Sequence, residues 1–211
     1  MTPKEKVYNF ISEQLTQGTL TREDKLTETF LAENTGLSRT PVREALLQLA
    51  ADNILDREPN KGFKLKHYSQ EDVENIYQII GVLDGKIAYE VCELLSDTDY
   101  ATMQFLIDSM YSAIKNSLYT KYNELQEQFH QVYTNYCKNT VLTKDLLDKK
   151  KIFIGKTYSR VDAHLIQNVL MTTNDEHQTI LNLFMQHKRK EVRDFLEYTH
   201  WNVENAQYDI W

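Results

Sequence analysis

Four polar residues within a short stretch, Ser38, Arg39, Thr40 and Arg43, have types and a spacing suited to contact with nucleic acid. The two arginines are four positions apart, so on a helix they share one face. A guanidinium group can bind guanine bidentately, and serine or threonine can bind phosphate. These residues therefore predict a DNA-binding helix. Lys61, in a turn further along the chain, would reach the adjacent backbone or minor groove.

Other residues with chemical potential carry weaker signals. The six histidines are His67, His130, His164, His177, His187 and His200. Histidines that meet in one pocket could hold a catalytic metal, so a metal-dependent enzyme is one alternative function. Against it, the chain has no nucleophile motif, phosphate-binding loop or HExxH, and only six glycines. The two cysteines, Cys92 and Cys137, lie far apart without CxxC spacing, which favours a reduced, cytoplasmic protein.

The elements that must position the arginines can be read in residues 1–67. Apolar residues at helical spacing predict a helix over 4–16, a second over 27–34, and a third that begins after Ser38 as N-cap. Gly36 supplies the turn between the last two. Alternating residues around Pro59-Asn60-Lys61-Gly62 predict a β-hairpin. Three helices followed by a hairpin form a winged helix-turn-helix, whose recognition helix enters the major groove. A winged helix that binds protein instead of DNA is a second alternative.

Residues 68–211 have a different composition, with no proline and a helical pattern throughout. Amphipathic segments are expected at 70–94, 98–117, 120–138, 141–150, 156–170, 174–187 and 189–206. Thr173 and Glu176 form a capping-box pattern before the sixth of them. The fold class is therefore mainly α, with the winged helix-turn-helix followed by an all-α antiparallel helical bundle. No run of eighteen apolar residues indicates a membrane span, and no signal peptide is evident.

The net charge of −7 argues against nucleic-acid binding until it is divided between these two parts. Residues 1–67 hold ten Lys/Arg and ten Asp/Glu, so all the excess acid lies after residue 67. Within 37–66, six basic residues stand against four acidic ones. An acidic second part would disfavour DNA that approaches in the wrong orientation.

The stretch LSRTPVREAL, residues 37–46, closely resembles the recognition helix of GntR-family bacterial transcription regulators. The stretch KLTETFLAENTGLS resembles the helix and turn that precede that family's recognition helix, and DNILDREPNKGFKL resembles its wing. The resemblance implies a homodimeric repressor or activator that binds a short, roughly palindromic double-stranded operator. It assigns base or phosphate contacts to Arg39 and Arg43, and it implies that Gly62 lets the wing approach DNA closely.

The second part resembles the FadR-like FCD effector-binding domain of the same family, through QFH at 128–130, NDEHQTIL at 174–181 and His200. The resemblance implies that His130, His177 and His200 hold a divalent metal such as Zn²⁺ or Ni²⁺, with an open position for a carboxylate. The family's fourth ligand, an Asp four residues before the first histidine, is Gln126 here, and Glu127 and Asn123 are the alternatives.

The FCD resemblance also suggests how an effector is recognised. Arg160 lies where relatives often place an arginine that pairs with an effector carboxylate, and Tyr133 could line the same cavity. In the first helix of this part, Asp84 stands where relatives have a longer acid, and their accompanying arginine is absent. The expected partners are operator DNA and a small organic acid, whose identity is not readable from the sequence.

Overall fold

A computed structural model of the chain describes residues 1–58, 62–155 and 162–208. Their contacts divide them into two compact units. Described residues of 1–68 and residues 151–155 form the first unit, and residues 69–150 and 162–208 form the second. The fold is mainly helical, with one small hairpin in the first unit.

The first unit is a winged helix-turn-helix. Its elements are α1 (Pro3–Thr16), α2 (Glu28–Thr35), α3 (Arg39–Ala51), β1 (Leu55–Glu58) and β2 (Gly62–Leu65). The Thr27 side chain caps α2, Gly36 ends that helix in the left-handed conformation, and Ser38 occupies the N-cap position of α3. The strands pair antiparallel with Leu55 opposite Leu65. The predicted helix-turn-helix and hairpin are therefore confirmed.

One hydrophobic core holds the helices and hairpin of this unit together. Apolar residues from each element face it at helical or strand spacing, among them Ile11, Leu31, Leu46 and Phe63. Backbone bonds between Leu26 and Phe63 attach the hairpin to the segment before α2. The core therefore fixes α3 and the hairpin in one rigid arrangement.

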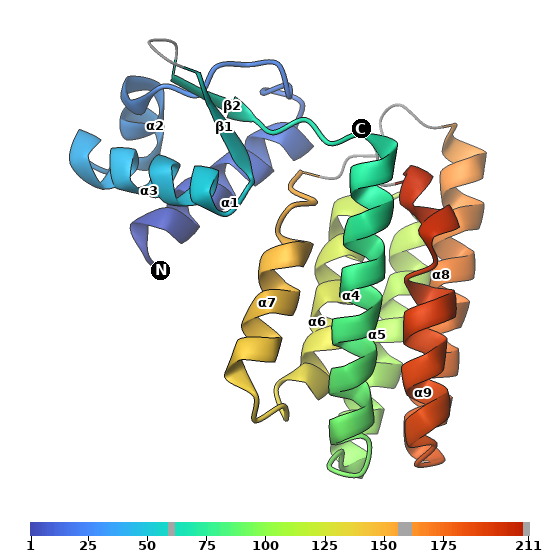
Figure 1. Cartoon of the computed structure of the whole chain (residues 1–211). Coiled ribbons are helices and arrows are strands. Elements are labelled where there is room, and N and C mark those ends of the chain that lie inside the picture. The colour runs from blue at the N-terminus through green and yellow to red at the C-terminus, as the bar shows by residue number, and fades with distance from the viewer. Residues whose placement is uncertain (59–61, 156–161, 209–211) are drawn as a thin grey trace. The chain divides into compact units, whose positions relative to one another are not determined.

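The second unit is a helical bundle whose long helices lie side by side (Figure 1). It contains α4 (Gln70–Val91), α5 (Asp97–Lys115), α6 (Tyr119–Thr134), α7 (Thr140–Lys150), α8 (Ala163–Met185) and α9 (Arg189–Phe195). A π-helical turn (Leu196–His200) and a 3₁₀ helix (Val203–Tyr208) follow. Capping boxes at Ser69 and Ser96 begin α4 and α5. Within the described residues, no helix is both long and apolar enough to cross a membrane.

The prediction of separate helices at 156–170 and 174–187 was wrong where it can be compared. A single helix, α8, runs from Ala163 to Met185 through the expected break. The Thr173 hydroxyl donates to the carbonyl of Val169 instead of capping a new helix. A threonine in mid-helix can bond back in this way, so its capping pattern alone did not establish a boundary. Residues 156–161 of the expected segment lie outside the described residues.

Close helix packing places the C-terminal turn against α4. A Cβ atom on Gly81 would lie 3.1 Å from the Glu197 carbonyl oxygen, and one on Gly85 would lie 2.9 Å from that of Arg193. The two glycines are one helical turn apart and therefore form a continuous strip without side chains. This strip lets the backbone of α9 and the π-turn approach α4, which brings His200, the last residue of that turn, toward the interior.

Candidate DNA-binding face and candidate metal centre

The residues expected to contact DNA lie at the exposed N-terminal end of α3. Ser38 has the extended backbone of an N-cap, but its hydroxyl makes no capping hydrogen bond to the helix. Arg39, Thr40 and Arg43 follow on the exposed side, whereas Val42 and Leu46 are buried in the core. The opposite face of α3 thus anchors the helix and leaves these polar groups directed outward.

Arg43 is engaged within the protein in a way that the sequence did not indicate. Its Nε donates to Oε1 of Glu28 at 2.7 Å, and its Nη2 donates to Oε2 at 2.9 Å. This bidentate contact holds the pKa of Glu28 below its usual value. The same two nitrogens present the geometry suited to a guanine edge. While Glu28 holds Nε and Nη2, the donors of Arg43 left for a base are the two on Nη1 and the second on Nη2.

The hairpin turn is only partly described. Gly62 has φ of +98°, a conformation that side chains disfavour, and a Cβ there would lie 3.0 Å from the Leu26 carbonyl oxygen. Glycine at this position thus has a role within the fold, besides the closeness to DNA that the resemblance implies. Lys61 lies outside the described residues.

Three of the six histidines come together inside the bundle. His130 on α6, His177 on α8 and His200 at the end of the π-turn are all buried. One potential ligand atom from each lies within 4.8 Å of the others, and among the described residues no other His, Cys, Asp or Glu joins this group. We call it the histidine triad.

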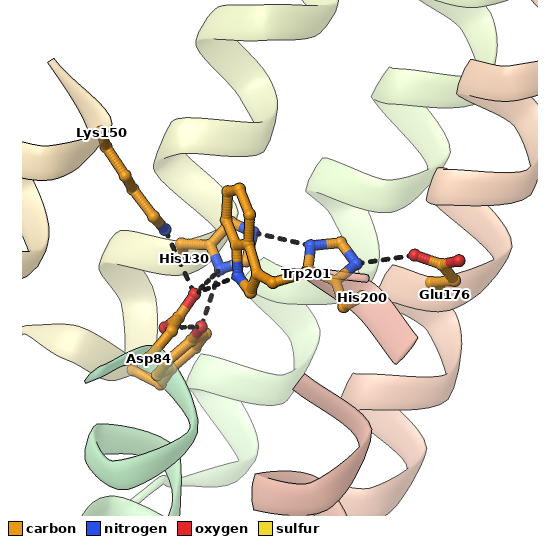
Figure 2. Close-up of polar contacts among 7 residues, drawn as sticks. Asp84, His130, Lys150, Glu176, His200 and Trp201 are labelled. Carbon is orange, nitrogen blue, oxygen red and sulfur yellow. Dashed lines mark hydrogen bonds and ion pairs between the residues drawn. The ribbon is translucent and has the colours of Figure 1, made fainter. Parts of the chain in front are cut away.

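Each histidine of the triad has a polar group near its Nδ1 atom. For His200 the partner is Oε2 of Glu176 at 2.8 Å (Figure 2). For His177 it is Oδ1 of Asn174 at 3.4 Å. For His130 the Tyr133 hydroxyl lies at 2.7 Å and Oδ2 of Asp84 at 3.2 Å. Partners of this kind fix the tautomer and ring orientation of metal-binding histidines.

The Nε2 atoms are consequently available for a cation. Because an ionised carboxylate only accepts hydrogen bonds, Nδ1 of His200 donates to Glu176, and the neutral imidazole then has its lone pair on Nε2. The Nε2 atoms of His130 and His200 lie 3.3 Å apart, and the buried Nε2 of His177 has no hydrogen-bond partner in the part of the chain that the structure describes. Two nitrogens bound to one tetrahedral zinc at about 2.05 Å each lie about 3.3 Å apart. The donor set therefore fits a divalent metal that prefers nitrogen.

Burial keeps two of these imidazoles neutral. Desolvation lowers the pKa of His130 to about 3, with a further contribution from the charge of Lys150, and the nearby Asp84 only partly opposes this. Desolvation likewise lowers the pKa of His177 well below its usual value. Neutral imidazole is the form that binds metal, so neither group needs to lose a proton at neutral pH.

Asp84 organises the polar groups on the far side of His130. Its carboxylate accepts hydrogen bonds from the Tyr133 hydroxyl, from Nε1 of Trp201 at 3.0 Å and from Nζ of Lys150 at 3.2 Å. Burial alone would raise the pKa of Asp84, but the charge of Lys150, the interactions with His130 and the hydrogen bond from Tyr133 together outweigh it and hold the pKa below the usual range. Asp84 is thus a fully buried carboxylate that stays ionised because Lys150 and its hydrogen-bond donors surround it.

The sequence prediction of the site was incomplete in its outer contacts. Asp84 was noted only as a departure from the family, and Lys150, Trp201 and Asn174 were not singled out. An acidic residue in the apolar run of α4 was the available signal for Asp84. No local pattern marks the other three, because their roles depend on helices that meet only in the fold.

The remaining predicted site residues have different surroundings. Tyr133 is buried, with its hydroxyl between His130 and Asp84. Gln126 is half-buried on α6, one turn before His130, and Glu127 is exposed. Arg160 lies outside the described residues. The fourth metal ligand thus stays a prediction.

Two sequence profiles match the chain. Residues 3–65 match "Bacterial regulatory proteins, gntR family", and residues 75–198, more than half of the chain, match the FCD domain. The chain belongs to the GntR family, in its FCD group. Both are domains of transcription regulators, so membership of this family excludes the enzyme alternative.

Individual relatives agree with membership of the GntR family. The uncharacterized regulator YdhC of Bacillus subtilis (strain 168) is 28% identical over 142 residues, which are 67% of this chain and 63% of YdhC. The regulator McbR of Escherichia coli (strain K12) is 32% identical over 108 residues, 51% of this chain and 49% of McbR. The chain thus spans between about half and two thirds of the length of these relatives.

Solved structures show the same fold. The structure of E. coli McbR/YncC has a TM-score of 0.77 at 21% identity, covering 100% of this chain and 96% of that one. A GntR regulator from Rhodococcus sp. RHA1 has a TM-score of 0.70 at 19% identity, covering 97% of this chain and 96% of that one. The chain therefore has the same fold as these two solved structures.

Proposed function

We propose that this protein is a homodimeric transcription regulator that binds operator DNA through α3 and the wing, under the control of a divalent metal and a small carboxylate. The observation that carries the metal part is the histidine triad, in which one ligand atom from each buried imidazole lies within 4.8 Å of the others and each Nδ1 has a polar group beside it. The family membership of residues 3–65 carries the DNA part.

The chain's own residues have distinct tasks in this proposal. His130, His177 and His200 hold the ion, for which Zn²⁺ or Ni²⁺ suits three imidazoles. A metal held by three protein ligands supplies an open coordination position that a carboxylate can take. Glu176 and Asp84 orient the imidazoles of His200 and His130. Gln126, Arg160 and Tyr133 stay candidates for contact with the ion or its ligand.

Regulation of DNA binding follows from the dimer. Half-sites one helical turn apart require a set spacing between the two recognition helices of a dimer. A ligand changes DNA affinity only if it binds the two arrangements with different free energies. A carboxylate that enters the triad region meets the Lys150–Asp84 ion pair, so its binding disturbs contacts among α4, α6 and α7.

The metal part is tested by elemental analysis and native mass spectrometry of the purified protein. We expect one divalent ion per chain, and a co-purified organic acid would add mass to the same species. His177→Ala removes the ion, whereas His164→Ala is the matched control because His164 is exposed on the same helix. Protein that stays metal-free after dialysis against Zn²⁺, Ni²⁺, Co²⁺ and Mn²⁺ in turn contradicts this part.

The DNA part is tested by fluorescence anisotropy with a duplex from the region upstream of the protein's own gene. We expect binding that persists in the presence of excess random duplex. This binding should weaken when Arg39 and Arg43 are both replaced by alanine. A shallower salt dependence should accompany the weaker binding, because fewer phosphate charges are neutralised. Equal affinity of the double variant and the natural protein would favour a winged helix that binds protein.

A further inference from the structure

A short segment from the middle of the FCD region packs onto the winged helix-turn-helix. This segment, residues 151–155, follows α7 and is called the strap here. The Tyr8 hydroxyl on α1 donates to the Lys151 carbonyl at 3.0 Å, and Nη2 of Arg22 donates to the Ile154 carbonyl at 3.1 Å. Ile154 is 2% exposed and belongs to the same hydrophobic core as Leu15. By these contacts the strap is part of the first unit.

The strap fits α1 closely because it ends on a glycine. Gly155 has φ of +69°, and an added Cβ would lie 2.5 Å from Cβ of Leu15 and 2.8 Å from its Cδ1. Real Cβ atoms essentially never lie this close to a non-bonded atom, so a side chain at position 155 would force Leu15 or the strap to shift. Gly18, just after α1, has φ of +73° but nothing within 4 Å of its Cβ position. Of these two glycines, Gly155 combines the left-handed backbone with a closed contact and Gly18 does not.

The residue just before the strap is bound in the other unit. Nζ of Lys150 lies 3.2 Å from Oδ2 of Asp84 and 4.9 Å from the ring centroid of Trp201 (Figure 2). Asp84 in turn contacts His130 of the triad. Lys150, whose side chain binds Asp84, is therefore joined directly to Lys151, whose carbonyl accepts the hydrogen bond from Tyr8 on α1.

We propose that the strap is a fixed part of the DNA-binding unit, and that it transmits the state of the Asp84–Lys150 ion pair to α1. A carboxylate that binds near the triad competes with Asp84 for the Lys150 ammonium, and a displaced Lys150 pulls on Lys151 and on the strap. The assignment of the triad as a ligand site rests on the proposed function, but the packing of the strap on α1 does not. The effector region would thus act on each DNA-binding unit within its own chain.

Hydrogen exchange of the full-length protein tests whether the strap packs against α1. Gly155→Ala should speed exchange of the α1 amides by roughly thirtyfold or more, as expected when a buried contact is lost. Gly18→Ala is the matched control, because it carries the same backbone strain without the clash. Equal exchange in α1 for the two variants would overturn the assignment of the strap to this unit.

A second pair of variants tests transmission. Lys150→Met removes the charge that pairs with Asp84, and we expect exchange in α1 and in the strap to change at least threefold. Lys149→Met, one position earlier on α7, should leave both unchanged. If Lys150→Met alters exchange in α4 and α6 but not in α1, the ion pair is local and the proposal fails.

These readouts require neither DNA nor metal. Natural protein that binds no promoter DNA and no metal would overturn the proposed function while the exchange results still decide whether the strap exists.

Discussion

A divalent metal should stabilise the bundle by an amount that the triad allows us to work out. Because His130 and His177 are already buried and neutral, binding at pH 7 displaces no proton from either. With free metal at a hundred times the dissociation constant, linkage adds about 2.7 kcal/mol to the free energy of unfolding. In a chain of this size that raises the melting temperature by roughly 5–11 °C.

The assay is thermal unfolding of protein stripped with a chelator and then titrated with Zn²⁺ or Ni²⁺. His177→Ala should lose most of the shift, because its buried Nε2 has no hydrogen-bond partner among the described residues and is free to bind the ion. His164→Ala, on the exposed side of the same helix, should keep the whole shift. A full shift in His177→Ala, or none with any of the metals in the natural protein, would refute the reasoning. Titration calorimetry in buffers of different ionisation enthalpy checks the proton count.

Two further predictions concern DNA and pH. Arg39→Ala should weaken specific DNA binding by roughly 5- to 150-fold. Arg43→Ala should weaken it by less, because Glu28 already holds two of the Arg43 donors. Fluorescence anisotropy at fixed salt compares the affinities of the two variants, and equal losses of affinity would mean that Glu28 releases Arg43 on DNA. Metal-free protein should be most stable above pH 6.5 and lose stability as the pH falls toward 3, because the lowered pKa values of His130 and His177 make the unfolded chain take up protons first. A melting temperature that is constant from pH 8 to pH 5 would contradict this sign.

The winged helix-turn-helix could be predicted almost completely from the sequence, because its signals are local. Gly36 before Ser38, the apolar spacing of Val42, Ala45 and Leu46, and the turn before Gly62 each involve neighbours along the chain. Local signals were less reliable in the bundle. Thr173 and Glu176 have the spacing of a capping box, but they lie inside α8, because the packing of a continuous apolar face outweighs one capping pattern.

The outer contacts of the metal centre could not be predicted in the same way. Family resemblance identified the three histidines, but it did not indicate that Asp84 and Lys150, 66 positions apart, would form a buried ion pair beside His130. Asp84 looked only like a shortened acid in an apolar helix. Its ionisation depends on a charge from α7, which no reading of α4 alone supplies.

The sequence by itself indicated which residues could bind DNA, because residue type and helical spacing decide which groups share a face, and family resemblance indicated which histidines could bind a metal. The tertiary structure decided how those groups are engaged. It paired Arg43 with Glu28, set the Nε2 atoms of His130 and His200 3.3 Å apart, and placed Gly155 against Leu15. Each of these depends on distances between elements far apart in the chain, which are set by the packing of the core.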